Sequence, residues 1–373
     1  MVALAPLLDA RTREADAALY DRLDSDRVRC HACGHACPIP DGARGVCQVR
    51  FNQGGRLFAP WGYVAGVQCD PIEKKPFFHA YPGGLAYSFG MLGCDLHCGY
   101  CQNWLTSQAI RDPRAVASAA SADPESMVRE ALRLDARVII STYNEPLITS
   151  EWAVAVFKEA RAAGLSTGFV SNGNATPRVL EFLRPWIDLY KVDLKSFDDR
   201  EYRKLGGRLE PILDTIRRLH TLDIWVEIVT LLVPGMNDSV DAIARLTAFV
   251  ASVSPEIPWH VTAFHPDYRM QNVGATESES LLRAVEIGHN AGLRFCYAGN
   301  APGRVGAHED TRCPDCASVL IRRDGFRVTD YRLTPAGRCP DCDRPVPGRW
   351  DPTVSGQAIT SPFRSRHSQP KRV

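Results

Sequence analysis

The chain has 373 residues, with 44 Lys and Arg against 43 Asp and Glu, so its formal net charge is +1. This balance excludes a broadly basic nucleic-acid coat and a strongly acidic solvating protein. The composition, 45% hydrophobic and 23% charged, is that of a globular chain rather than a disordered one. No apolar run approaches the roughly 20 residues of a membrane helix, and the first residues lack the pattern of a signal peptide. We therefore expect a cytoplasmic protein with neither a membrane nor a nucleic acid as its partner.

Cysteine is the unusual component, because thirteen cysteines occur in a chain without an evident export signal. Such cysteines should stay reduced, and clustered reduced cysteines are most often metal ligands. All but Cys69 and Cys296 fall into three tight groups. The groups are Cys30, Cys33, Cys37 and Cys47; Cys94, Cys98 and Cys101; and Cys313, Cys316, Cys339 and Cys342.

The N-terminal part divides into a lead-in segment and a small cysteine module. In the lead-in, residues 1–27, the stretch 11–23 has the pattern of a short amphipathic helix. Residues 28–66 carry the first cysteine group among glycines and polar turns, which is typical of a metal-binding knuckle. Its C-x2-C-x3-C-x9-C spacing suits zinc or an auxiliary iron–sulfur cluster, and we favour zinc. A module this small has little core, so the metal should supply much of its folding energy.

Residues 67–303 are expected to form one α/β domain. From about residue 85, short β-branched or aromatic runs alternate with helical patterns, which indicates crossover connections and a parallel sheet. So many units favour a partial or nearly closed (β/α) barrel, and a doubly wound open sheet is the alternative. Helix caps are expected at Asp123, Thr176 and either Asp238 or Ser239. The expected strands are 86–90, 137–142, 167–171, 188–194, 225–233, 259–264 and 293–299.

The second cysteine group lies in the loop MLGCDLHCGYCQNW (91–104), directly after the first expected strand of this domain. Three thiolates in C-x3-C-x2-C can hold three irons of a [4Fe–4S] cluster and leave the fourth iron without a protein ligand. An open metal position suits catalysis, whereas a structural site is normally closed by four ligands. The alternative is a zinc site completed by His97 or a distant residue. Because the other two groups each have four cysteines of their own, we favour the cluster.

Polar residues follow nearly every expected strand of the domain. In α/β barrels the active site is built from residues just past the carboxyl ends of the strands. Loops of any barrel are polar, but their repetition on the rim that carries the cysteine loop predicts an active site there. The residues concerned are Tyr143–Pro146, Asn172–Asn174, Asp193, Lys195, Pro234–Asp238, His265–Asp267 and Asn300–Gly303.

The cysteine loop, with the aromatic Tyr100 before its third cysteine, resembles the loop of the radical S-adenosylmethionine (SAM) superfamily. The resemblance implies that SAM chelates the open iron through its amino and carboxylate groups. One-electron reduction then cleaves SAM to methionine and a 5′-deoxyadenosyl radical, which abstracts hydrogen from a substrate. It also implies a one-electron reductant of the flavodoxin or ferredoxin type.

The same resemblance implies roles for several residues of the polar rim. Asn144–Glu145–Pro146 resembles the motif in which Glu145 accepts hydrogen bonds from the SAM ammonium group, although many relatives have Gly where this chain has Asn144. Ser171 and Asn172 resemble ribose- or carboxylate-binding groups, with an ordinary helix-entry turn as the alternative. The remaining implied cofactor-binding residues are Tyr100, Val233 and Pro234, the last two through their backbone at the adenine edge.

Three residues are candidates for catalysis. Asp193 and Lys195 lie in VDLKSFD, which resembles the D-L-K stretch of glycyl-radical activating enzymes, and a buried structural ion pair is the alternative. His265 could donate to the substrate or could be a structural histidine. The segment DPIEKKP (70–76) lies shortly before the first expected strand of the domain. The charges of its residues 73–75 either cover the barrel mouth, meet a partner or form a solvated turn.

The C-terminal part carries Cys313-Pro-Asp-Cys316 and Cys339-Pro-Asp-Cys342 with 22 residues between the two pairs. Two such knuckles supply four thiolates for zinc or iron, so residues 304–350 should form a zinc-ribbon or rubredoxin-like module. Residues 351–373 are expected to be a flexible tail.

Taken together, the motifs over residues 28–350 resemble those of the AmmeMemoRadiSam-system radical SAM enzymes, which are related to pyruvate formate-lyase activating enzymes. This narrower resemblance implies no particular substrate. A protein or peptide substrate is favoured by the D-L-K stretch, and a small molecule is the second hypothesis. The third is a non-enzymatic zinc protein that binds nucleic acid or protein, which the charge of +1 does little to support.

Overall fold

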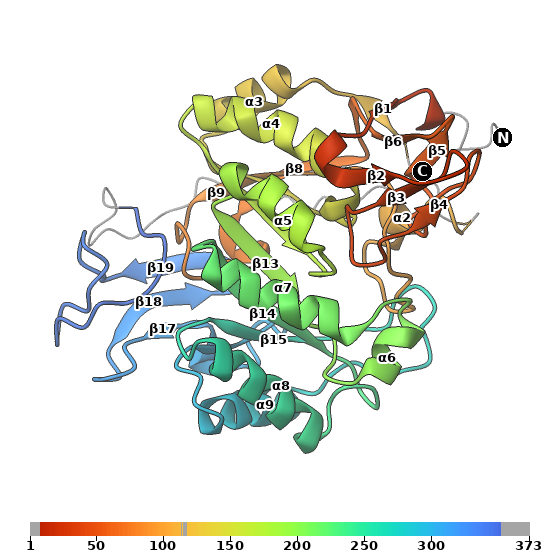
Figure 1. Ribbon diagram of the computed structural model, residues 1–373. Coiled ribbons are helices and arrows are strands. Elements are labelled where there is room, and N and C mark those ends of the chain that lie inside the picture. The colour runs from red at the N-terminus through yellow and green to blue at the C-terminus, as the bar shows by residue number, and fades with distance from the viewer. Residues whose placement is uncertain (1–7, 113, 115–117, 352–373) are drawn as a thin grey trace.

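The computed structural model describes residues 8–112, 114 and 118–351, and its centre is one eight-stranded sheet (Figure 1). The strand order is β16-β15-β14-β13-β12-β11-β9-β8, and β8 (Gly66–Pro71) runs antiparallel to β9 at one edge. In the described part of the chain the edge strands β8 and β16 do not pair with each other, so the sheet is a partial barrel, as predicted. The parallel strands are β9 (Leu85–Gly90), β11 (Ala136–Ser141), β12 (Ser166–Ser171), β13 (Leu189–Asp193), β14 (Trp225–Leu232), β15 (Trp259–Ala263) and β16 (Cys296–Gly299).

Helices connect successive parallel strands and cover the outer face of the sheet (Figure 1). No helix in the described ranges is long and apolar enough to cross a bilayer. The longer helices are α3 (Pro124–Arg133), α4 (Ser150–Ala162), α5 (Pro177–Leu183), α7 (Leu209–Thr221), α8 (Val240–Val253) and α9 (Ser278–Asn290). Short turns are α2 (Trp104–Ser107), α6 (Asp199–Lys204), η2 (Ile72–Lys74), η3 (Pro146–Thr149), η4 (Arg184–Trp186) and η5 (Gly306–Glu309).

The helices begin where the sequence predicts their caps. Asp123 accepts a hydrogen bond from the Ser126 amide, and Thr176 does the same for Val179. At α8 the cap is Ser239 rather than Asp238. Each helix then turns an apolar stripe to the sheet; in α7 that stripe is Ile212, Leu213, Ile216 and Leu219, all buried. A capped start thus precedes the apolar pattern in α3, α5 and α8, whereas α4, α7 and α9 begin without a side-chain cap.

The helix predicted for residues 11–23 is wrong. Instead, β1 (Thr12–Glu14) pairs with β6 (Arg56–Pro60), and β2 (Tyr20–Arg22) pairs with β3 (Val28–Cys30), on either side of the single turn η1 (Ala17–Leu19). Pairing with distant strands outweighs the local helical pattern, because it also buries Leu19 completely. The remaining short strands of this part are β4 (Pro38–Ile39), β5 (Phe51–Gln53), β7 (Tyr63–Val64) and β10 (Ala120–Ser121).

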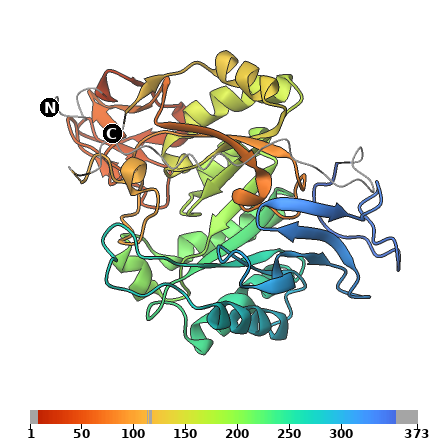
Figure 2. The same ribbon diagram turned by 180° about the vertical axis from the view of Figure 1, so that it is seen from behind.

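The C-terminal module packs at the amino ends of the parallel strands, on the opposite side of the molecule from the N-terminal module (Figures 1 and 2). It consists of β17 (Thr311–Arg312), β18 (Val319–Asp324) and β19 (Arg327–Tyr331) in one antiparallel sheet. Phe78, Phe295 and Tyr297 of the barrel share one apolar cluster with Leu320 and Ile321 of the module. The predicted tail lies outside the described residues from position 352 onwards.

A buried ion pair fixes this junction. Arg323 donates hydrogen bonds to the Phe78 carbonyl at 2.7 Å and to Thr311 Oγ1 at 2.8 Å, and its Nε lies 3.6 Å from Glu73 Oε1. Burial raises the pKa of Glu73 to about 7, while the Arg323 charge counteracts this. Glu73 and Lys75 are both buried, so the segment 73–75 is not the solvated charged turn considered as an alternative.

We predict that Arg323→Met lowers the free energy of unfolding by about 3–5 kcal/mol, because it leaves the Glu73 carboxyl buried without its partner. The double variant Arg323→Met/Glu73→Gln should recover part of this loss, since it removes both charges. Urea denaturation measures both changes. The exposed Arg327→Met, whose partner Asp324 is also exposed, is the matched control and should cost less than about 1 kcal/mol. Equal effects at positions 323 and 327 would contradict the prediction.

Candidate radical SAM site

The loop that carries Cys94, Cys98 and Cys101 starts directly after β9 and is held in place by its neighbours. Met91 donates its amide to Asn144 Oδ1 at 3.0 Å, which ties the start of the loop to the carboxyl end of β11. Gly93 follows with a φ of +95°, and a Cβ there would stand 2.7 Å from Val49 Cγ1. This position therefore requires glycine both for its backbone and for its close contact with the N-terminal module.

The three thiols sit in a mostly apolar pocket of the barrel rim. Cys98 is buried in one cluster with Leu96, Tyr100, Val233 and Phe264, and Cys94 and Cys101 pack against that cluster. Burial raises the pKa of all three thiols, that of Cys98 to about 11. Thiols in such surroundings ionise when a bound cation compensates the charge, so the site suits metal ligation.

Asp95 joins the cysteine loop to the next strand ends. Its carboxylate is fully buried and accepts hydrogen bonds from Asn172 Nδ2 and Asn174 Nδ2, both at 2.7 Å. The Asp95 carbonyl also lies 3.2 Å from His35 Nε2 of the N-terminal module. Asp95 and Asn174 were not among the predicted cofactor-binding residues. Asn174 was expected on the polar rim because it follows a strand, whereas the only signal of Asp95 in the sequence is its place beside Cys94.

Glu145, Ser171 and Asn172, three of the predicted cofactor-binding residues, meet at the carboxyl ends of β11 and β12. Glu145 accepts hydrogen bonds from Ser171 Oγ at 2.7 Å, from the Asn172 amide at 2.8 Å and from the Leu147 amide at 3.1 Å. Burial and the neighbouring Asp95 charge raise the pKa of Glu145 to about 8. A cation placed beside this carboxyl group would favour its ionised form.

Asp193 and Lys195 form an ion pair at the end of β13, with Lys195 Nζ 3.4 Å from Asp193 Oδ2. Lys191, which the sequence analysis did not single out, binds the other oxygen of Asp193. Its signal was its position two residues before Asp193, because alternate residues of a strand share a face. The Lys195 charge lowers the pKa of Cys98 and Cys101 against the effect of burial, so this lysine lies beside the cysteine loop.

The other predicted residues lie on the same rim. His265 is exposed, and its Nε2 lies 2.9 Å from Gln102 Nε2, next to Cys101 in the chain. The Val233 amide donates to Asn237 Oδ1 at 2.7 Å, so its donor is engaged within the turn. His97, the alternative fourth zinc ligand, packs its ring against Gly206. Among the described residues it is not part of a compact group of metal-ligating side chains. The roles of these residues stay predictions.

The C-terminal cysteines form a compact tetrad. The Sγ atoms of Cys313, Cys316, Cys339 and Cys342 all lie within 4.8 Å of one another. Two of the separations are 3.5 Å, from Cys313 to Cys342, and 3.6 Å, from Cys316 to Cys339. A tetrahedral ion with metal–sulfur bonds of about 2.3 Å needs sulfurs about 3.8 Å apart, so the tetrad fits one zinc or iron ion.

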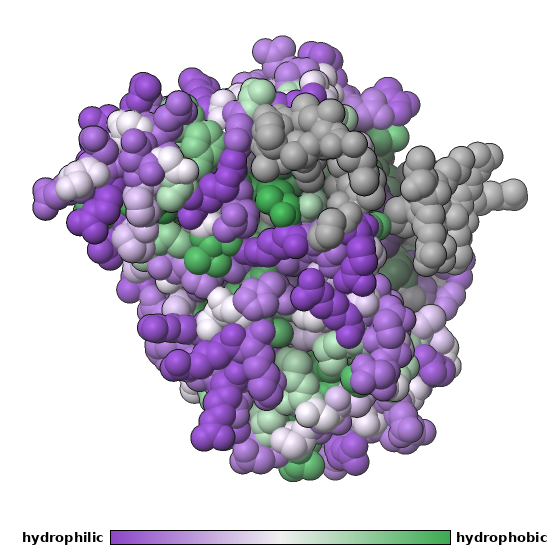
Figure 3. Space-filling model, turned by 90° about the vertical axis from the view of Figure 1, so that its right-hand side faces the viewer, coloured by the Kyte–Doolittle hydropathy of each residue, from purple (hydrophilic) through white to green (hydrophobic). Residues whose placement is uncertain are grey.

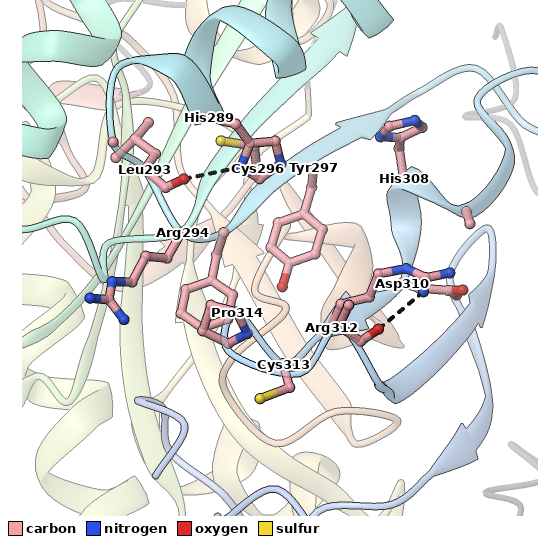
Figure 4. Close-up of a pocket in the computed structure, with 14 residues that line it drawn as sticks. His289, Leu293, Arg294, Cys296, Tyr297, His308, Asp310, Arg312, Cys313 and Pro314 are labelled. Atoms are coloured by element: carbon pink, nitrogen blue, oxygen red, sulfur yellow. Dashed lines mark hydrogen bonds between the residues drawn. The ribbon is translucent and has the colours of Figure 1, made fainter. Parts of the chain in front are cut away.

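A separate pocket lies between α9, the start of β16 and the C-terminal module (Figure 4). His289, Arg294 and Tyr297 line it from the barrel, and His308 and Arg312 from the module. It lies at the amino ends of the parallel strands and contains Cys313 of the tetrad, but no residue of the cysteine loop 94–101. It is therefore distinct from the rim site. The face of the molecule shown in Figure 3 is largely hydrophilic, with small hydrophobic areas between polar residues.

Comparisons with known proteins agree with this geometry. The family model of the radical SAM superfamily matches residues 90–247. An uncharacterised protein of Methanocaldococcus jannaschii is 35% identical over 334 residues, which cover 89% of this chain and 98% of that protein. The pyruvate formate-lyase-activating enzyme of Staphylococcus epidermidis is 26% identical over 228 residues, 54% of this chain and 87% of that enzyme.

Among solved structures, a radical SAM methyltransferase from Sphaerobacter thermophilus is 15% identical, with a TM-score of 0.48 over 64% of this chain and 71% of that chain. The match to the family model spans the cysteine loop and the strands from β11 to β14. Residues 90–247 of the chain form a domain of the radical SAM superfamily.

We predict that Cys316→Ser/Cys342→Ser loses one equivalent of zinc or iron, because the tetrad then keeps too few thiolates for a closed site. Elemental analysis of the purified full chain measures the loss. The control is Cys69→Ser, a cysteine outside all three groups, which should keep every metal. Metal contents that stay equal in the two proteins would rule out a metal at the tetrad.

Proposed function

We propose that the chain is an enzyme that cleaves SAM reductively and uses the resulting radical on a protein or peptide. Cys94, Cys98 and Cys101 would hold three irons of a [4Fe–4S] cluster. The cluster, when bound, supplies the electron that splits the sulfonium of SAM into methionine and a 5′-deoxyadenosyl radical, which takes a hydrogen atom from the substrate. The observation that carries the proposal is that Asp95, next to Cys94, is hydrogen-bonded to Asn172, whose amide binds Glu145.

The residues of this chain would bind and orient the cofactor. Glu145, inside the rim, offers a carboxylate to the SAM ammonium group, and Ser171 lies 2.7 Å from its Oε1. Leu96, Val233 and Phe264 exclude water from the side of the thiols. Asp193 and Lys195 lie beside the loop, where they would contact SAM or the backbone of a substrate.

The preference for a polypeptide substrate rests on the D-L-K stretch and on the relatives named as activating enzymes. The relative from Staphylococcus epidermidis aligns with 54% of this chain and 87% of its own length. The external electron would come from a small protein of the flavodoxin or ferredoxin class.

We expect the anaerobically purified and reduced protein to convert SAM to 5′-deoxyadenosine, measured by liquid chromatography. Cys94→Ala should abolish this conversion and lose one cluster's worth of iron and sulfide, because two thiolates hold the cluster poorly. Cys69→Ala should behave like the wild type. Intact SAM in the presence of a fully loaded and reduced cluster would refute the enzymatic function.

We expect Glu145→Gln to bind SAM at least about tenfold more weakly, a loss of about 1.4 kcal/mol, because an amide cannot pair with the ammonium charge. Equilibrium dialysis of the anaerobic protein measures the affinity. Glu159→Gln, on the exposed surface of α4, is the matched control. An affinity that does not change at position 145 would remove this residue from the SAM site.

The class of substrate can be tested with a native extract split by ultrafiltration. We expect the protein fraction, and not the small-molecule filtrate, to increase the rate of 5′-deoxyadenosine formation. Protease treatment of that fraction should abolish the increase. Stimulation by the filtrate alone would favour a small-molecule substrate.

A further inference from the structure

The N-terminal cysteines lie against the barrel rather than in an independent appendage. Cys30 ends β3, and its amide donates to the Cys37 carbonyl at 3.0 Å. Cys33 and Cys47 are buried in one apolar cluster with Val49 of the module and Ile148 of the barrel. Cys33 and Cys47 thus lie between the N-terminal module and the barrel, whereas Cys30 and Cys37 pack with the core of the module.

The spacing of these thiols differs from that of the C-terminal tetrad. In the described ranges the C-terminal tetrad is the group of metal-ligating side chains whose ligand atoms all lie within 4.8 Å. Cys30, Cys33, Cys37 and Cys47 are all described, and they are less closely gathered. Thiolates that bind different irons of one cluster stand further apart than thiolates that share a single ion. The wider set therefore suits an iron–sulfur cluster better than zinc.

A buried guanidinium next to the thiols lacks acceptors for two of its nitrogens. Arg50 is 1% exposed and binds Glu151 through Nη2, whereas Nε and Nη1 have no hydrogen-bond partner among the described residues. Cys30 and Cys47 lie close enough for their charge to act on Arg50. Buried N–H groups without acceptors are costly, and sulfur atoms of a negatively charged cluster would supply both acceptors and compensating charge.

The loop that carries Cys47 is in contact with the radical SAM loop. A Cβ on Gly93 would stand 3.4 Å from the Cys47 carbonyl, and Gly93 directly precedes Cys94. Arg111 bridges the two loops, because it binds the Val46 carbonyl and also donates to the Cys94 carbonyl at 2.7 Å. The two cysteine loops therefore lie against each other, joined by these backbone contacts.

We propose that Cys30, Cys33, Cys37 and Cys47 hold an auxiliary iron–sulfur cluster that passes electrons to the cluster of the Cys94 loop. This revises our preference for zinc from the sequence, and the relay rests on the proposed function. In each transfer the auxiliary cluster is oxidised by one electron and the radical SAM cluster is reduced by one. The electron that restores the auxiliary cluster comes from the external one-electron reductant, so no bond is made or broken in this step.

The site can be tested without SAM cleavage in the full-length variant Cys94→Ala/Cys98→Ala/Cys101→Ala, reconstituted anaerobically with iron and sulfide. We expect this variant to keep one iron–sulfur cluster, with a visible absorption band and an electron paramagnetic resonance signal after reduction by dithionite. Adding Cys30→Ser/Cys47→Ser should remove both. Zinc in place of iron, or no difference between the two variants, would overturn the proposal.

The relay can be tested in Cys30→Ser/Cys47→Ser with the Cys94 loop intact. A flavodoxin should reduce the remaining cluster at least about tenfold more slowly than in the wild type, followed by stopped-flow absorbance. An equal rate would overturn the relay. If this variant does not fold, Cys37→Ser can be made in the triple-alanine background, because Cys37 is the least buried of the four ligands. We expect Cys37→Ser to change the electron paramagnetic resonance spectrum of the auxiliary cluster. An unchanged spectrum would overturn the site.

These outcomes separate the inference from the proposed function. If the wild type leaves SAM intact while the triple-alanine variant holds a cluster, the proposed function fails and the auxiliary site stands. If the wild type cleaves SAM while the triple-alanine variant holds no cluster, the proposed function stands and the auxiliary site fails.

Discussion

The rim site depends on one buried carboxylate. Asp95 follows Cys94 in the chain, and its two oxygens accept hydrogen bonds from Asn172 and Asn174. A fully buried carboxylate is stable only when such donors surround it. These hydrogen bonds therefore hold the cysteine loop against the end of β12. Through the Asn172 amide, the same contact fixes Glu145. Groups that are distant in the sequence are in this way held in one geometry before any cofactor binds.

Much of the barrel was predictable, because its parallel strands are buried apolar runs between segments with a helical pattern. All seven predicted runs are strands in the structure. The antiparallel edge strand β8 was missed, because GVQCDP contains glycine, proline and aspartate and has no strand-like pattern of its own. The stretch 11–23 was mistaken for a helix for the converse reason. Its local pattern is helical, and only the register with β6 and β3 makes it extended.

The candidate site divides in the same way. The cysteines were found by their spacing, and Glu145, Ser171 and Asn172 by their places after strands. Asp95 and Lys191 could not be ranked above other charged residues, since their importance comes from burial and from partners on other strands. Arg50 is a similar case. Nothing in its neighbourhood in the sequence shows that it pairs with Glu151, about a hundred residues away.

The junction with the C-terminal module closes one end of the barrel. At the amino ends of the strands, Ile72, Phe77 and Leu189 fill the interior with side chains, and Arg323 ties the module over them. Side chains consequently fill the amino end of the barrel, and the cysteine loop lies at the opposite, carboxyl end. A molecule that binds at the carboxyl rim is therefore not expected to pass through this filled end of the barrel.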